Sequence, residues 1–284
     1  MIDLPKAFIF GAEATGRSLL HIVSEHYQVI GFIDNDLTSK DAFYRDIPIL
    51  KPNVILQTDF DVVIIASIPG FRPITKQLLE MGIERHKIVT EYISTPIEAR
   101  ILFLEKLGEL FYEKGIEGSC AEGGVFQGDF AKEINRVFFD RKLYLFDTFE
   151  GFDEKDVLFD KMNNYSCYSA GYYGQTNEEI VIANLPNPDL CVIRRVFFPQ
   201  TAEGLENEVF CFVNLDFDLY NPILAGLEFF VPRMVDGGVI LIHDYFGETF
   251  KGVKEAVNEF INERTDLQIF PVGDGISIGL TKRC

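Results

Sequence analysis

The chain of 284 residues carries 26 lysine and arginine side chains against 44 aspartate and glutamate side chains, which gives a formal net charge of −18. Hydrophobic residues make up 47% of the sequence and charged residues 25%, a composition that supplies a large core and excludes a globally disordered chain. The negative charge repels phosphate-rich partners, so we expect neither nucleic-acid binding nor attachment to an anionic membrane.

The five cysteines lie far apart in the sequence and include no Cys-x-x-Cys pair. This usage is typical of reduced cysteines rather than of a disulfide framework or a thiolate zinc site. No stretch approaches the ~20 uninterrupted apolar residues that cross a bilayer, and the N-terminus lacks the pattern of a secretory signal. We therefore expect a cytoplasmic protein.

The first third of the sequence alternates apolar runs with helical patterns. Strands are predicted at residues 7–10, 29–33, 62–66 and 87–89. Helices are predicted at residues 18–25 and 73–81. Runs of β-branched residues without polar alternation are typical of strands buried on both faces, so this order predicts a parallel sheet of right-handed βαβ units.

A second α/β series follows a break at Thr95-Pro96, after which residues 97–113 predict a connecting helix. Strands are then predicted at residues 119–122, 143–146, 192–197, 210–215 and 239–242, followed by a hairpin of residues 268–272 and 276–280. The fold class is therefore α/β, with two Rossmann-like doubly wound sheets, the second with an antiparallel edge strand. We expect domains of residues 1–95 and 117–284, joined by residues 96–116.

A glycine-rich turn opens the second series. Residues 122–128, Glu-Gly-Gly-Val-Phe-Gln-Gly, follow a predicted strand and open a helix. Glycines let a ligand approach the backbone there, and Asp147, at the end of the next strand, is placed to accept hydrogen bonds from ribose hydroxyls. The pair indicates a nucleoside-bearing cofactor. The alternative is a turn that only packs a helix tightly on the sheet.

Polar side chains gather at the ends of two later strands. Asp216 and Asp218 end one buried strand, and His243 and Asp244 end the next. Three carboxylates gathered beside an imidazole repel one another unless a bound cation or a role in proton transfer stabilises them. Aspartate and histidine suit a divalent metal, which acidifies a coordinated hydroxyl. The alternative is that these residues only cap the helices that follow.

These motifs resemble those of the macrocin/mycinamicin-type sugar O-methyltransferases, the TylF/MycF/NovP group. Residues 122–128 match Glu-x-Gly-Val-aromatic-x-Gly, and residues 147–151 match Asp-Ser-Phe-Glu-Gly with threonine for serine. Residues 216–220 match Asp-x-Asp-Leu-Tyr, and the resemblance extends over about half of the chain. It implies a class I methyltransferase fold, S-adenosylmethionine as methyl donor and a divalent metal, magnesium or manganese.

The resemblance also implies roles for individual residues. Asp216, His243 and Asp244 would ligate the metal. Asp218 would be the general base that removes the proton from a sugar hydroxyl, with His243 as a second catalytic candidate. The methyl donor would be held by Glu122, Gly123, Gly124, Gly128, Asp147, Thr148, Phe149 and Thr201.

The chain departs from the family pattern at three positions. His243 replaces the first of two paired aspartates, and imidazole is a poor magnesium ligand. The site is therefore expected to favour manganese, iron or zinc, unless His243 serves as a base instead. Gln200 replaces an acidic residue, which weakens one cofactor contact, and Asp129 replaces a second glycine, which alters the loop.

The first domain has the frame of a dinucleotide loop at residues 11–16, but Glu13 replaces its middle glycine and would repel a pyrophosphate. This disfavours NAD binding and a dehydrogenase. Residues 31–35, Gly-Phe-Ile-Asp-Asn, resemble a stretch of nucleotide-sugar-binding Rossmann domains of polysaccharide enzymes. The alternative for this domain is a scaffold or dimerisation role without a ligand.

Residues 163–174 of the second domain are rich in Tyr, Gly and Asn. We predict that they form either a lid over the acceptor or a plain surface loop.

We therefore predict an S-adenosylmethionine- and metal-dependent O-methyltransferase. It would act on a hydroxyl of a small sugar or nucleotide sugar, or of a glycan-attached sugar. The alternative from another class is a binding or scaffolding protein whose methyltransferase-like domain does not catalyse. The sequence is compatible with a homodimer but does not determine the oligomeric state.

Overall fold

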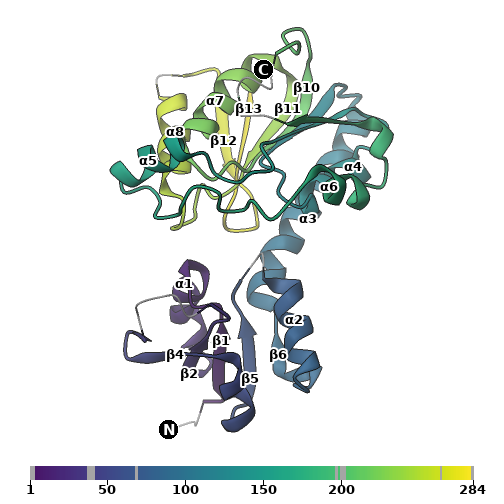
Figure 1. Ribbon diagram of the computed structural model, residues 1–284. Coiled ribbons are helices and arrows are strands. Elements are labelled where there is room, and N and C mark those ends of the chain that lie inside the picture. The colour runs from purple at the N-terminus through teal and green to yellow at the C-terminus, as the bar shows by residue number, and fades with distance from the viewer. Residues whose placement is uncertain are drawn as a thin grey trace. The chain divides into compact units, whose positions relative to one another are not determined.

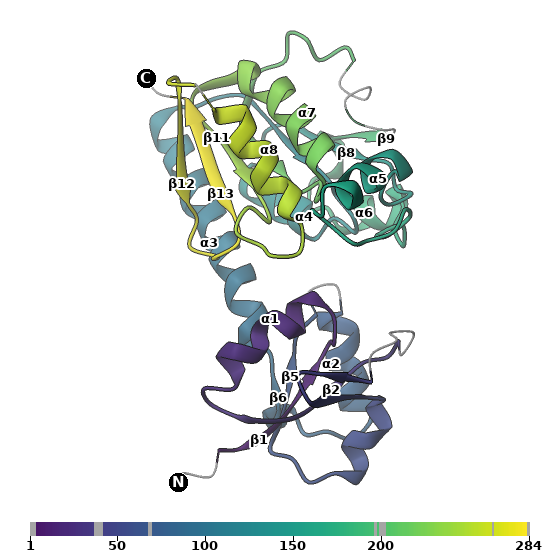
Figure 2. The same ribbon diagram turned by 90° about the vertical axis from the view of Figure 1, so that its left-hand side faces the viewer.

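The computed structural model describes most of the chain: residues 4–36, 42–67, 70–195, 198, 203–262 and 264–282. The chain divides into two compact units, Met1–Glu98 and Ala99–Cys284. Each unit contains one mostly parallel sheet with helices packed on it, as Figures 1 and 2 show. The predicted α/β class with two sheets is confirmed. Within the described residues, no helix combines the length and the apolar character needed to span a membrane.

The sheet of the first unit has the strand order β3-β4-β2-β1-β5-β6. Its strands are β1 (Lys6–Phe10), β2 (Gln28–Ile33), β3 (Phe43–Tyr44), β4 (Ile47–Leu50), β5 (Val62–Ile65) and β6 (Ile88–Val89). The short strands β3 and β4 pair antiparallel at one edge. Sequence patterns miss them, because Pro48 within β4 is typical of a loop or of an edge strand.

Alternate residues of β1 face opposite sides of this sheet. Phe8 and Phe10 are buried with residues of helix α2 (Phe71–Glu80). Ala7 and Ile9 are buried with residues of helix α1 (Ala14–Val23) on the other face. Helices cover both faces, which explains why the central strands are apolar throughout. Short 3-10 helices at residues 52–57 and 85–87 complete the unit.

Helix α3 (Glu91–Lys114) contains the boundary between the two units. The predicted break at Thr95-Pro96 is wrong, because Pro96 lies inside this helix. A proline removes one backbone N–H, and with it one bond to the carbonyl four residues earlier. The helix continues because tertiary packing stabilises it: Leu104 and Phe111 are fully buried in the core of the second unit.

The sheet of the second unit has the strand order β12-β13-β11-β10-β7-β8-β9. Its strands are β7 (Ser119–Gly123), β8 (Leu143–Asp147), β9 (Cys191–Arg195), β10 (Phe210–Leu215), β11 (Met234–Ile242), β12 (Leu267–Pro271) and β13 (Ile278–Lys282). Strand β13 pairs antiparallel with both of its neighbours, β11 and β12. The closing hairpin inserts its second strand beside β11, so its first strand, β12, is the edge strand and pairs antiparallel, as predicted.

Helices pack on both faces of this sheet (Figure 2). They are α4 (Asp129–Val137), α5 (Glu154–Met162), α6 (Glu178–Asn184), α7 (Tyr220–Phe230) and α8 (Lys251–Ile261), with 3-10 helices at 188–190 and 231–233. One core cluster contains residues of α7 and α8, and the other contains residues of α3 and α4. Since β7, β8, β10 and β11 are parallel, their carboxyl ends lie along one edge of the sheet. The turns after these ends hold most of the predicted site residues.

Candidate active site at the carboxyl ends of the strands

The glycine turn after β7 fits tightly between the two neighbouring strands. The amide of Gly124 donates to the carbonyl of Phe146 (2.9 Å), and the amide of Asp216 donates to the carbonyl of Gly123 (2.8 Å). A Cβ atom on Gly124, whose φ is +81°, would lie 2.0 Å from the carbonyl oxygen of Asp216. A Cβ atom on Gly123 would lie 2.2 Å from the ring of Phe217. The turn therefore lies in direct backbone contact with the strand end that carries the acidic residues.

Asp147 holds this turn in shape. One carboxylate oxygen accepts hydrogen bonds from the amides of Val125 (2.7 Å) and Phe126 (2.9 Å), and the other accepts from the amide of Phe149 (2.8 Å). A carboxylate has about four lone-pair sites, so three backbone donors leave one acceptor position for a ribose hydroxyl. Asp147, which the sequence predicts to bind a ligand, therefore also stabilises the conformation of the glycine turn.

The residues after Asp147 form a second turn beside the first. The hydroxyl of Thr148 donates to the carbonyl of Gly151 (3.1 Å) and accepts from the amide of Glu150 (3.2 Å). Phe149 is buried and has a φ of +57°. Thr148 and Phe149, both predicted to bind the cofactor, therefore also help to stabilise the conformation of this turn.

Gly128 ends the glycine turn and begins helix α4. Its φ of +81° lies in the left-handed region, and its amide donates to the carbonyl of Val125 (2.9 Å). The first turn of α4 contains Asp129, whose negative charge suits a helix N-terminus. The aspartate in place of a second glycine is therefore accommodated as a helix-starting residue.

Thr201, Phe197 and Gln200 lie outside the described residues. Phe198, which belongs to the same predicted cofactor segment, is described and is buried. Its ring packs against the rings of Phe146 (5.5 Å between centroids) and Phe217 (5.4 Å). Phe198 is thus a core residue beneath the glycine turn.

The predicted acidic cluster is present at the ends of β10 and β11. One ring nitrogen of His243, Nδ1, lies 3.1 Å from a carboxylate oxygen of Asp216 and 3.1 Å from one of Asp244. One possible ligand atom from each of these three residues lies within 4.8 Å of the others. The amide of His243 donates to the carbonyl of Leu215 (3.0 Å), which joins the two strand ends.

Charge interactions dominate this cluster. Burial lowers the pKa of His243, but the charges of Asp216 and Asp244 outweigh it and raise that pKa to about 10. Burial raises the pKa of Asp216, but the charges of His243 and Arg100 hold it below its ordinary value. Burial raises the pKa of Asp218 well above its ordinary value, and the nearby carboxylates of Asp244 and Asp216 add to the shift. The raised pKa gives the carboxylate of Asp218 a higher affinity for a proton, beside the three residues that could bind a cation.

A family model described as Macrocin-O-methyltransferase (TylF) matches residues 94–269, which is more than half of the chain. The chain belongs to the macrocin-O-methyltransferase (TylF) family. It is therefore an O-methyltransferase, as the motifs predict. Residues 4–89 match a second family, described as C2185-like, N-terminal. No curated protein matches the chain.

Two solved structures resemble this TylF-family chain at low sequence identity. The O-methyltransferase NovP is 19% identical, with a TM-score of 0.52, over 66% of this chain and 80% of NovP. CalS11, a calicheamicin methyltransferase, is 16% identical, with a TM-score of 0.52, over 87% of this chain and 98% of CalS11. At these identities the likeness shows a shared methyltransferase fold.

Two polar residues of the methyltransferase unit were not predicted to belong to the site. Arg100, on α3, donates through Nη2 to Asn214 (2.9 Å) and to Asp216 (3.2 Å). Asn214 in turn donates to Glu122 (2.8 Å), so the predicted cofactor acid and the acidic cluster are linked. Asn214 lies in β10 two residues before Asp216, which directly follows the strand, and this alternate spacing could have suggested it. No sequence signal marks Arg100.

Glu122 is one of the few buried acids of the unit. It is 2% exposed, and burial, with a further contribution from the charge of Asp216, raises its pKa well above the ordinary value. Its Oε1 accepts from Asn214, whereas Oε2 has no partner among the described residues. A buried carboxylate oxygen without a donor is unusual, and it leaves one acceptor open beside the glycine turn.

The aromatic segment at residues 163–174 packs onto the glycine turn. Gly171 donates to the carbonyl of Phe152 (3.0 Å), and Phe152 donates to the carbonyl of Tyr172 (3.1 Å). The ring of Tyr173 meets that of Phe126 edge-on at 5.2 Å. Burial raises the pKa of Tyr173, and Asp218 adds to this shift, which indicates that the phenol lies near the acidic cluster. These contacts tie the segment to the methyltransferase site.

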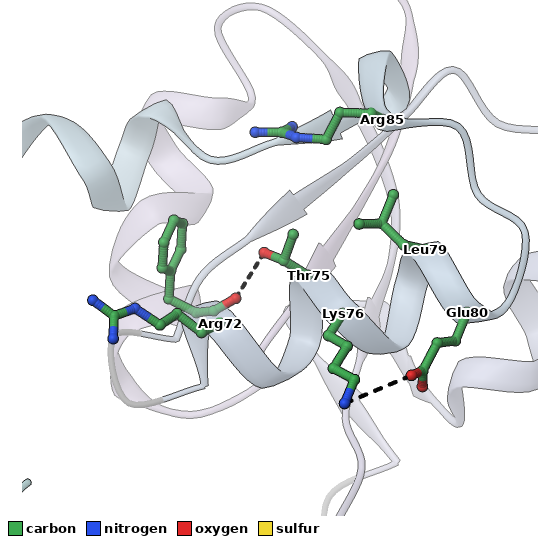
Figure 3. Close-up of a pocket in the computed structure, with 7 residues that line it drawn as sticks. Arg72, Thr75, Lys76, Leu79, Glu80 and Arg85 are labelled. Carbon is green, nitrogen blue, oxygen red and sulfur yellow. Dashed lines mark hydrogen bonds and ion pairs between the residues drawn. The ribbon is translucent and has the colours of Figure 1, made fainter. Parts of the chain in front are cut away.

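In the first unit, as in the second, an aspartate after a neighbouring strand accepts a hydrogen bond from the backbone of the glycine loop. Asp34, after β2, accepts a hydrogen bond from the amide of Ala12 (2.9 Å). Gly16 lies so close to the loop that a Cβ atom there would be 1.8 Å from the carbonyl oxygen of Gly11. A separate hollow of about 470 Å³ lies along α2 in this unit, lined by Phe71, Arg72, Thr75, Lys76, Leu79, Glu80 and Arg85. Figure 3 shows the lining side chains as sticks. None of the predicted site residues lines this hollow.

Proposed function

We propose that this chain transfers the methyl group of S-adenosylmethionine to a sugar hydroxyl with the help of a divalent cation. The observation that carries the proposal is the backbone contact between the two halves of the site. The Asp216 amide bonds to Gly123 at 2.8 Å, so the donor loop and the acidic cluster are adjacent. Methyl transfer from a sulfonium requires the donor and the acceptor to be held close and in line.

The donor side of the site suits S-adenosylmethionine. The free acceptor position of Asp147 is available for a ribose hydroxyl, and Oε2 of Glu122 is available for a cationic or hydroxyl group of the donor. The glycines at 123 and 124 let the turn lie directly against the strand end that carries the acidic residues. Such a turn, with a helix N-terminus behind it, is typical of nucleoside-binding sites.

The donor set of the acidic cluster fits a divalent transition metal. Two carboxylates and one imidazole offer ligand atoms within 4.8 Å of one another. The imidazole of His243 favours manganese, iron or zinc over magnesium. A bound cation would supply Lewis acidity that lowers the pKa of the sugar hydroxyl. Ion binding would also require His243 to give up its proton.

The chain's own residues would then move the proton and exclude water. Asp218 lies beside the cluster and would take the proton of the sugar hydroxyl, whose oxygen then attacks the methyl carbon as the donor sulfur leaves as a thioether. The rings of Phe152 and Tyr173 pack edge-on against each other at 5.5 Å, and this aromatic pair would provide apolar contact for a sugar ring. The description of the family as macrocin O-methyltransferases also supports a sugar acceptor, nucleotide-linked or glycan-attached. The free cysteines support a cytoplasmic location.

Asp218→Asn tests this assignment. Removing the base should lower methyl transfer at least about 100-fold while calorimetric binding of S-adenosylmethionine persists. Transfer would be measured as S-adenosylhomocysteine release with a panel of nucleotide sugars and Mn²⁺. The control is Asp156→Asn, which changes a buried acid bonded to Asn221 outside the cluster. Wild-type protein that binds NADH but no S-adenosylmethionine would contradict the proposal.

A further inference from the structure

An unbroken chain of polar contacts connects the proposed donor site to the proposed cation site. It runs from Glu122 to Asn214 (2.8 Å), from Asn214 to Arg100 (2.9 Å) and from Arg100 to Asp216 (3.2 Å). Arg100 is the centre of this chain, because one nitrogen, Nη2, donates to both of its partners. It belongs to α3, more than 100 positions earlier in the sequence than β10.

We propose that Arg100, through its fixed positive charge beside Asp216, limits how tightly the divalent cation binds at the cluster. This inference rests on the proposed function of the cluster as a cation site. It assigns to Arg100 a role that none of the sequence motifs contains.

The setting of Arg100 restricts the guanidinium to one position. The residue is only 9% exposed, and its guanidinium carbon lies 3.9 Å from the ring centroid of Phe130. Stacking on an aromatic face and a bond to Asn214 hold the planar group from two directions. Its Nε atom is buried without a partner among the described residues. An unpaired buried donor is unfavourable, so we attribute the placement of this side chain to the Nη2 contacts.

The contact between Arg100 and Asp216 also determines the charges that surround a cation bound at Asp216. One oxygen of Asp216 is paired with Arg100 at 3.2 Å, and the other faces His243 at 3.1 Å. Arg100 keeps its charge at every physiological pH, so it neutralises part of the Asp216 charge permanently. A divalent cation on Asp216 must therefore bind next to a fixed positive charge, which weakens its attraction.

The test compares Mn²⁺ binding to the full-length chain with Arg100 intact and replaced. Arg100→Met keeps an apolar stem against Phe130 but removes the charge and both hydrogen bonds. Arg100→Lys keeps the charge. The matched control is Arg233→Met, because Arg233 also stacks on a phenylalanine, at 4.1 Å from the ring centroid of Phe229, and its buried Nε also has no partner within the described part of the chain. Mn²⁺ dissociation constants would be measured by titration of the free-ion electron paramagnetic resonance signal, without methyl donor or acceptor.

We expect Arg100→Met to bind Mn²⁺ about tenfold more tightly than wild type, because a full charge next to the site is gone. Arg100→Lys and Arg233→Met should stay within about threefold of wild type. An unchanged or weaker affinity in Arg100→Met, or the same gain in Arg233→Met, overturns the role of Arg100 while the proposed function stands. Wild-type protein that binds no Mn²⁺ overturns both. Circular dichroism of each variant verifies that it is folded.

Discussion

Gly124→Ala would place a methyl group against the backbone of the neighbouring strand. The added Cβ would lie 2.0 Å from the carbonyl oxygen of Asp216 and 2.6 Å from its carbonyl carbon. Both atoms belong to the backbone at the end of β10, so they cannot rotate away as a flexible side chain would. The φ of +81° at this position is also unfavourable for any residue with a Cβ atom. The substitution therefore combines a conformational penalty with a steric one.

The two penalties can be separated by magnitude. A left-handed backbone conformation costs about 1–2 kcal/mol for an L-residue. Extra volume in a packed region costs about 1–3 kcal/mol more, and the rigid neighbour puts Gly124→Ala at the upper end. We expect a loss of about 3–5 kcal/mol in the free energy of unfolding of the second unit. Gly204→Ala is the matched control, since its φ is +82° and no heavy atom of the described residues lies within 4 Å of the added Cβ. It should lose only about 1–2 kcal/mol.

The assay is urea unfolding of the full chain followed by circular dichroism, because the sequence contains no tryptophan. Both glycines belong to the second unit, so the two variants report on the same transition. Gly124→Ala should also weaken calorimetric binding of S-adenosylmethionine, whereas Gly204→Ala should not. Equal losses of stability in the two variants would refute the reasoning, because they would mean that the contact with Asp216 carries no energy.

Two further predictions concern buried acids and metal preference. Asp160 is fully buried, and burial raises its pKa from 3.8 to about 6, so the folded state holds this proton more tightly than the unfolded state. The stability that this bound proton contributes is complete below pH 3.8 and is lost as the pH rises through 6. Between pH 5 and 7.5, the free energy of unfolding of the wild type should therefore fall by about 1 kcal/mol relative to that of Asp160→Asn, as measured by urea unfolding. A pH-independent difference would contradict this. His243→Asp restores two adjacent carboxylates and should lower the ratio of Mn²⁺- to Mg²⁺-supported methyl transfer about tenfold; an unchanged ratio would show that the imidazole does not select the metal.

The meeting of Asp216, His243 and Asp244 could be predicted from the sequence. Two apolar runs without alternation indicate parallel strands, and parallel strands bring their carboxyl ends to the same edge. Polar residues placed directly after such runs must then lie near one another, as the spacing within 4.8 Å shows. The glycine turn after residue 122 follows from the same local logic, because its shape depends on glycines at fixed positions.

The contacts of Asp147, Pro96 and Arg100 depended on the tertiary structure. A sequence shows that Asp147 follows a strand, but two of its three backbone donors, the amides of Val125 and Phe126, reach it only because the turn after the adjacent strand folds back beside it. Pro96 is a local signal for a break, and the packing of α3 downstream overrides that signal. Arg100 reaches Asp216 because α3 packs on the sheet, a contact between residues more than 100 positions apart. Periodicity determines which face of an element is apolar, whereas the packing of whole elements decides which distant polar groups meet.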